Sequence, residues 1–177
     1  MALVLESAGV IEESTGDFLT RATIWLAMLA WTGGIVMQGR GRGRLFRGFW
    51  TTGLSFYLIH ICFAYSEFYQ WSHRVAWDST ARDTLEMTGV DSGFGLLVNY
   101  ALVLVLAIDV FLQWKVGDRR GARWIDGLVI FMIVNGAIIF GSGSVRWFGA
   151  ALIASILTAL VWNGLKAGKE ISCDESR

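Results

Sequence analysis

Residues 94–114 read FGLLVNYALVLVLAIDVFLQW, and Asp109 is the only charged side chain among them. About 20 consecutive apolar residues are what a helix needs to cross the hydrocarbon core of a bilayer. Four further apolar stretches come close to this length, at 18–38, 49–69, 124–141 and 147–165. The sequence therefore predicts an all-α membrane protein, in which a five-transmembrane-helix bundle forms a single integral membrane domain over residues 1–177.

The composition agrees with this fold class. The chain has 177 residues, of which 54% are hydrophobic, and it contains no proline that would break a helix. Five crossings take up about a hundred residues at this length. Too little chain remains for a separate soluble domain of more than about 50 residues.

Positive charge alternates between the segments that join the apolar stretches. One side holds eleven of the 15 Lys and Arg residues: the loop residues Arg40, Arg42, Arg44, Arg47, Lys115, Arg119, Arg120 and Arg123, and the tail residues Lys166, Lys169 and Arg177. The other side holds Arg21, Arg74, Arg82 and Arg146. Cationic loops are retained in the cytoplasm. The eight loop residues are therefore predicted topology anchors of a multi-pass protein of the cell (inner) membrane, with the N-terminus outside and the C-terminus cytoplasmic.

The first basic loop contains the run GRGRGR at 39–44. Arginine–glycine runs occur in segments that bind nucleic acid. A single run this short makes a poor nucleic-acid groove, and a topology anchor beside the membrane explains it. We therefore expect the lipid bilayer as a partner and no nucleic acid.

Residues 72–88, between the second and third stretches, have the pattern of a short amphipathic helix. One face carries charges of alternating sign every four residues, at Arg74, Asp78, Arg82 and Glu86. The opposite face carries His73, Trp77, Thr80, Thr84 and Met87. We expect an interfacial helix on the outer surface that ends at Gly89 and turns its second face toward the membrane domain.

Three residues near the outer end are candidate ligands. His60 and Glu67 lie on one face of the second crossing, about 10 Å apart at 1.5 Å per residue, and His73 lies on the amphipathic helix. Ionisable side chains inside a membrane are energetically costly, so their presence suggests a functional site. Three interpretations remain open: a transition-metal site, a haem site, and interhelical hydrogen bonding without a cofactor, which polar side chains of membrane helices commonly provide.

Other polar residues inside the crossings form either a path or interhelical pairs. They are Arg21, Asn99, Asp109 and Asn135. Arg21 is an available counter-charge for Glu67. A proton or small-solute conductor requires a continuous series of buried polar groups, and these four residues are widely spaced. For Asp109, pairing with a basic loop residue is the favoured interpretation.

Small residues recur at four-residue spacing in two crossings. The fifth has Ala150, Ala154 and Thr158 beside Ala151, Ser155 and Ala159, and the first has Ala30 and Gly34. Such faces let helices approach closely. The approaching helix is either another crossing of this chain or part of a second subunit, and we expect a membrane-protein partner or a homo-oligomer. The tryptophans near the span ends, at Trp25, Trp31, Trp50, Trp71, Trp114, Trp124 and Trp147, have the pattern of an interfacial aromatic belt.

The sequence contains no Ser/His/Asp arrangement, P-loop, Rossmann fingerprint or HExxH motif. The leading functional hypothesis is a small structural or accessory subunit of a membrane complex, with a polar pocket on its outer side. The alternatives are a small membrane-bound metal- or haem-dependent enzyme or redox subunit using His60, Glu67 and His73, and a proton or small-solute conductor.

Overall fold

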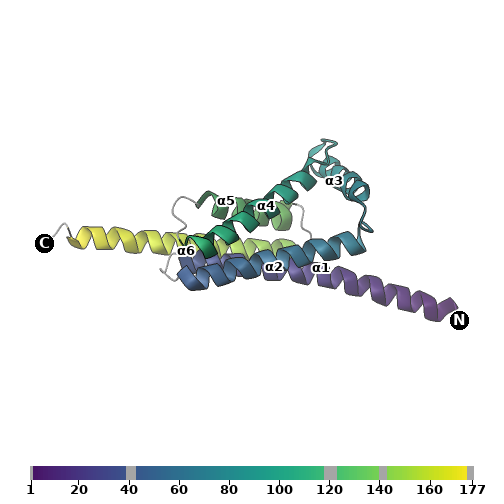
Figure 1. The fold of residues 1–177 in the computed structure, drawn as a ribbon, viewed down its shortest axis with the longest axis horizontal. Coiled ribbons are helices and arrows are strands. Elements are labelled where there is room, and N and C mark those ends of the chain that lie inside the picture. Colours follow the sequence, from purple (N-terminus) through teal and green to yellow (C-terminus); the bar gives the residue numbers. More distant parts are fainter. Residues whose placement is uncertain (1, 39–42, 118–122, 140–142, 175–177) are drawn as a thin grey trace. The chain divides into compact units, whose positions relative to one another are not determined.

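The computed structural model describes the backbone of residues 2–38, 43–117, 123–139 and 143–174, and the side chains of 15–37, 43–117, 124–138 and 145–162. Within these ranges every regular element is a helix. The elements are α1 (Ala2–Gln38), α2 (Gly43–Glu67), α3 (His73–Thr88), α4 (Phe94–Lys115), α5 (Arg123–Ile133), the π-helix η1 (Val134–Ile139) and α6 (Gly143–Asp174) (Figure 1). The predicted all-α fold class is confirmed for this part of the chain.

Within the described residues, three helices are long and apolar enough to cross a membrane. They are Thr15–Met37 of α1, Phe94–Lys115 of α4 and Val145–Trp162 of α6, and they match the first, third and fifth predicted crossings. The other two predicted crossings are also helical. α2 is less apolar because polar residues such as Thr51 and His60 interrupt it, and the apolar stretch Trp124–Ile138 is shorter.

The chain folds as two compact units. The first unit contains Met1–Ala27 and Thr52–Phe111, and thus all of α3 and most of α4. The second contains Met28–Thr51 and Leu112–Arg177, and thus α5, η1 and α6.

In the first unit, α1 contains buried threonines whose hydroxyl groups bond to carbonyls of the same helix. The hydroxyl of Thr20 donates to the carbonyl of Gly16 at 2.9 Å, and that of Thr23 to the carbonyl of Leu19 at 2.8 Å. Because each hydroxyl is satisfied within its own helix, both threonines can be buried without an unpaired polar group. The other buried side chains of this unit include Tyr57 of α2, Ala76 of α3 and Leu96, Leu102 and Leu106 of α4.

Helix α3 has regular caps at both ends. Ser72 lies in an extended conformation, and its side chain accepts a hydrogen bond from the Val75 amide at 3.4 Å. Gly89 adopts the left-handed conformation with φ 76°, and its amide donates to the Leu85 carbonyl at 2.8 Å. The prediction of a helix over 72–88 with Gly89 as its stop is confirmed. Figure 1 shows α3 between the end of α2 and the start of α4.

In the second unit, two tryptophans lie in the core instead of in an aromatic belt. Trp31 and Trp50 are fully buried. An ideal Cβ on Gly34 would lie 3.3 Å from Trp50 Cε3, so this glycine brings the indole ring against the α1 backbone. The belt prediction was wrong for these two residues because small neighbours in α1 make room for large rings. Trp71, Trp114, Trp124 and Trp147 are exposed, as the belt interpretation requires.

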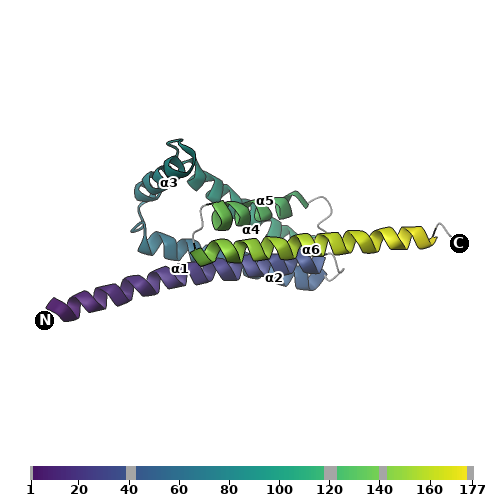
Figure 2. The same ribbon diagram turned by 180° about the vertical axis from the view of Figure 1, so that it is seen from behind.

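The fourth predicted crossing is not one continuous α-helix. α5 ends at Ile133 and is followed by the π-helix η1. Asn135 and Gly136 are weak α-helix formers, and η1 lies against α6 so closely that a Cβ on Gly149 would be 2.5 Å from Ala137 Cβ. Figure 2 shows this part of the chain running beside α6. The helical pattern was predicted correctly, whereas the change of helix type depends on packing that the pattern does not contain.

Candidate functional site

The three predicted ligands each have different surroundings. His60 Nδ1 lies 2.9 Å from the Thr20 carbonyl oxygen, so this nitrogen carries the proton and donates to the carbonyl. Glu67 is exposed, and its carboxyl group lies against α1, where an ideal Cβ on Gly16 would be 2.5 Å from Oε2. Among the residues that the structure describes, no three His, Cys, Asp or Glu side chains gather as a metal-binding group. The structure therefore does not bring His60, Glu67 and His73 together.

His73 instead belongs to a hydrogen-bonded chain with two tyrosines. Its Nδ1 lies 3.0 Å from the Tyr100 hydroxyl, and the two rings are stacked with centroids 5.9 Å apart. The Tyr100 hydroxyl in turn is hydrogen-bonded to the Tyr65 hydroxyl. One residue from each of α2, α3 and α4 thus meets at this point, all within the first unit.

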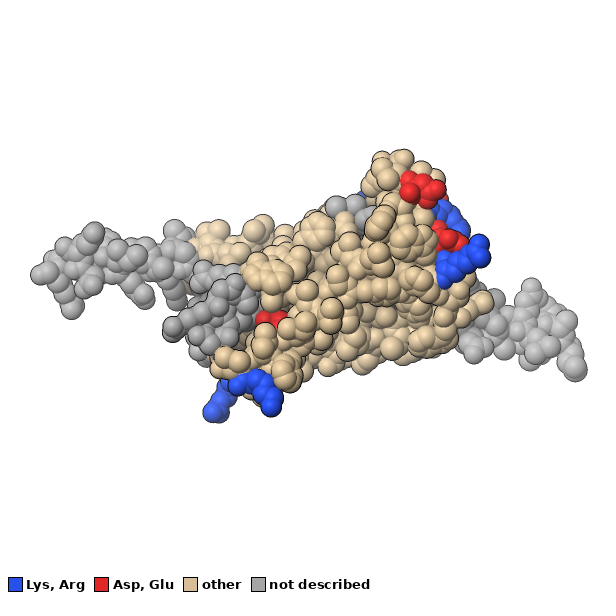
Figure 3. Space-filling model, turned by 45° about the horizontal axis from the view of Figure 1, so that its top comes forward, with Lys and Arg blue, Asp and Glu red and all other residues tan. Residues whose placement is uncertain are grey.

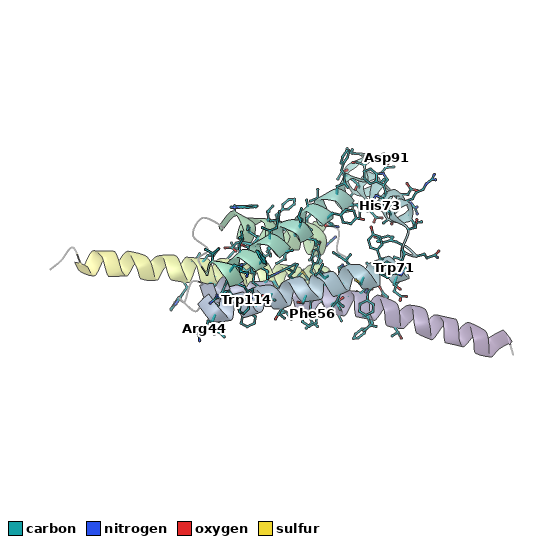
Figure 4. All side chains as sticks on the ribbon, in the orientation of Figure 1. Arg44, Phe56, Trp71, His73, Asp91 and Trp114 are labelled. Carbon is teal, nitrogen blue, oxygen red and sulfur yellow. The ribbon has the colours of Figure 1, made fainter. Side chains whose placement is uncertain are left out.

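Further aromatic rings surround this chain. Tyr65 contacts Tyr69 edge to face at 5.5 Å between centroids, and it contacts Trp71 at 6.2 Å. We call Tyr65, Tyr69, Trp71, His73 and Tyr100 the tyrosine–histidine cluster. Figure 4 shows Trp71 and His73 at the turn between α2 and α3. Trp71 is 67% exposed, so the cluster reaches the surface of the unit.

The backbone of this turn is strained. Gln70 and Trp71 have φ values of 48° and 58°, in the left-handed region that side-chain-bearing residues rarely adopt. Each such residue costs of the order of 1–2 kcal/mol. Two hydrogen bonds hold the turn, from the Trp71 amide to the Tyr65 carbonyl at 2.9 Å and from the Ser72 amide to the Tyr69 carbonyl at 2.8 Å. Strain of this kind in a bulky residue is typical of functional sites, and here it fixes the indole ring beside Tyr65.

Helix α3 is docked onto the start of α4 through the face predicted from the sequence. The Trp77 ring lies against Gly93, where an ideal Cβ would be 2.7 Å from Nε1, and it contacts Phe94 edge to face at 5.8 Å. Thr80 lies against Gly95 in the same way, with 3.1 Å between its Cγ2 and an ideal Cβ. Two glycines therefore provide the close approach that seats the cluster's histidine over Tyr100.

The other face of α3 is charged and exposed. Arg74 and Asp78 form an ion pair at 3.9 Å, with both side chains mostly in solvent. A pair this exposed contributes little to stability. Figure 3 shows Lys, Arg, Asp and Glu residues together at α3, beside a broad surface on which charged residues are sparse. The amphipathic pattern of the sequence is thus present in the structure.

Three of the predicted polar-path residues interact with other groups of the chain. Arg21, an available counter-charge for Glu67, instead forms an ion pair with Asp17 of its own helix at 2.9 Å. The Tyr57 hydroxyl donates to Asn99 Oδ1 at 3.5 Å. Asp109 is 5% exposed and interacts with another group of the chain. Asn135 is half-buried in η1, in the other unit.

Among the predicted topology anchors, Arg47 has defined contacts within the second unit. Its guanidinium lies 5.4 Å from the centroid of the Trp114 ring and donates to the Gln113 carbonyl at 3.2 Å. The Trp114 indole donates to the Thr51 hydroxyl at 3.0 Å. Arg44 and Lys115 are exposed. Arg40, Arg42, Arg119, Arg120 and the side chain of Arg123 lie outside the described residues.

The cluster contains residues that sequence reasoning missed. His73 was found because it lies on an amphipathic helix, but Tyr65 and Tyr100 were not. A signal existed in the aromatic run at 65–71, which reads YSEFYQW. The partner Tyr100 is 35 residues away from Tyr65, and no local pattern connects the two.

Comparison with known proteins adds no further assignment. No protein-family model, no curated protein and no solved structure matches this chain.

Proposed function

We propose that this chain is an integral membrane protein with five crossings that serves as a small accessory subunit of a membrane complex. In this proposal the N-terminus and α3 face the outside, α3 lies at the membrane interface, and the C-terminus faces the cytoplasm. The role is binding and assembly, and the tyrosine–histidine cluster is its outer polar site.

The observation that carries the proposal is the uncharged, exposed surface of α4. Large apolar side chains along this helix are exposed, among them Leu104 at 62% and Phe111 at 60%. Its one internal acid, Asp109, is buried. Each square ångström of apolar surface left in water costs about 25 cal/mol, so lipid or other protein must cover a surface of this kind.

The small-residue face of α6 supports assembly with a partner. Ala151, Ala154, Ser155 and Thr158 are all exposed. The hydroxyls of Ser155 and Thr158 donate to carbonyls one turn earlier, at 2.9 and 2.8 Å. The face is therefore small and has no unsatisfied hydroxyl donor, which suits close contact with another membrane helix.

Replacement of Ala154 by Ile tests this role. The larger side chain should hold the partner helix away and reduce the assembled fraction, as measured by size-exclusion chromatography with light scattering of protein extracted in mild detergent. Leu160→Ile is the matched control, because it places the same residue at an exposed position that is already large. Unchanged assembly in Ala154→Ile, or equal loss in both variants, would refute the proposed role of this face.

A further inference from the structure

We propose that the tyrosine–histidine cluster binds the head group of a lipid-soluble quinone. The inference rests on the membrane function proposed above and names a ligand class for its outer site. Three features support it. The hydrogen bonds within the cluster leave one donor unused, the aromatic rings are exposed, and an apolar strip on α4 begins beside the cluster.

The hydrogen count of the cluster leaves one donor for a ligand. A neutral His73 has one N–H, and Tyr100 and Tyr65 have one O–H each. The chain from His73 Nδ1 through Tyr100 to Tyr65 contains two hydrogen bonds. Three hydrogens serve two bonds in either histidine tautomer, so one hydrogen remains at a tyrosine hydroxyl or at Nε2. A quinone carbonyl is an acceptor that such a donor matches.

The rings offer a flat surface for a flat ligand. Trp71 is exposed and held beside Tyr65 by the strained turn, and His73 is exposed beside Tyr100. Planar rings prefer offset-stacked or edge-to-face contacts with aromatic side chains. A benzoquinone or naphthoquinone ring can therefore contact the cluster through its face while a carbonyl receives the hydrogen bond.

An apolar strip on α4 runs from the cluster. Leu104, Ala107 and Phe111 follow Tyr100 at helical spacing on one face, and all are exposed. An isoprenoid tail needs such a surface within the bilayer. Tyr100 lies in the first third of α4, a helix of membrane-crossing length, so under the proposed membrane function the quinone ring would lie toward the outer end of the crossing.

Other lipid head groups fit the cluster less well. A phosphate would be repelled by the negative charge of Asp83, which acts on Tyr69 of the cluster. A quaternary ammonium needs rings around it, but the centroids of Tyr69 and Trp71 already lie within 5.5 and 6.2 Å of Tyr65. An uncharged acceptor ring avoids both problems.

Photoaffinity labelling of the full chain in lipid nanodiscs tests the inference. The probe is a short-chain benzoquinone that carries an aryl azide, and the competitor is decyl-benzoquinone. We expect saturable labelling of residues 65–73 and 94–104, removed by the competitor but not by decylbenzene, which has the same tail and no carbonyl. Tyr65→Phe and Tyr100→Phe each remove one hydroxyl and so leave the spare donor on another atom of the cluster, away from the carbonyl. Each should raise the half-saturating concentration about three- to tenfold, the usual range for one hydrogen bond.

Tyr57→Phe is the matched control, because it removes a tyrosine hydroxyl from the same unit at a buried position outside the cluster. Its half-saturating concentration should equal that of the unmodified chain. Labelling that does not saturate, or that responds equally to all three variants, overturns the quinone inference alone when the chain is found in the nanodiscs. A chain that stays out of the nanodiscs overturns both this inference and the membrane function on which it rests.

Discussion

Gly93 is the residue on which the seating of α3 depends most directly. An added Cβ would lie 2.5 Å from Trp77 Cδ2 and 2.7 Å from Nε1. The rigid indole cannot yield as a flexible side-chain end would. We predict that Gly93→Ala destabilises the first unit by about 1–3 kcal/mol, the usual cost of overpacking, as measured by thermal unfolding of the detergent-solubilised protein monitored by circular dichroism.

Gly127→Ala is the control for this substitution. Gly127 lies in α5, and nothing approaches its Cβ position within 4 Å, so an added methyl group meets open space and favours the helix by up to about 1 kcal/mol. Its unfolding temperature should stay the same or rise. Equal losses in the two variants would show that the Trp77 contact is not the cause.

Only some of the residue contacts in the site could be predicted from the sequence. His73 and Trp77 could be assigned to one face because they belong to a single helix with a clear period. The contact of Tyr65 with Tyr100 could not be assigned, because it depends on how α2, α3 and α4 meet. Arg21, named as an available counter-charge for Glu67, pairs instead with Asp17, which lies one turn away on the same helix.

At the scale of elements, the π-helix η1 packs against α6, and one methyl group of η1 makes a very close contact there. Ala137 Cβ occupies the space that a Cβ on Gly149 would need. We predict that Gly149→Ala destabilises the second unit by about 1–3 kcal/mol through overpacking, and that Ala137→Gly in the same chain restores most of the loss. Unfolding of the two single variants and the double variant gives the coupling energy. Additive effects would mean that the two positions do not share this space.

Elements differ in how far local sequence defines them. α3 has its charge ladder, its Ser72 cap and its Gly89 stop within 18 residues, and its bounds were predicted to within one residue. The continuous helix expected at 124–141 contained Asn135 and Gly136, but their weak helix propensity did not show that the chain would widen to a π-helix. Ala137 of η1 packs closely against α6, a contact that no local pattern contains.

At the scale of the whole molecule, the predicted orientation in the membrane depends on the basic residues of the charge pattern, and the structure shows that some of these are exposed. Arg44 and Arg82 lie on opposite sides of the predicted pattern, and both are exposed. In a chain with Cys62 and Cys173 replaced by Ala, we predict that Arg82→Cys reacts with a membrane-impermeant maleimide in intact spheroplasts. Arg44→Cys should react only after permeabilisation, because positive-inside retention keeps its loop in the cytoplasm. Both cysteines should react with a membrane-permeant maleimide, which confirms that each thiol is accessible. If Arg44→Cys is labelled from outside and Arg82→Cys is protected, the orientation is the opposite of the predicted one. The α3 helix and the tyrosine–histidine cluster would then lie on the cytoplasmic face.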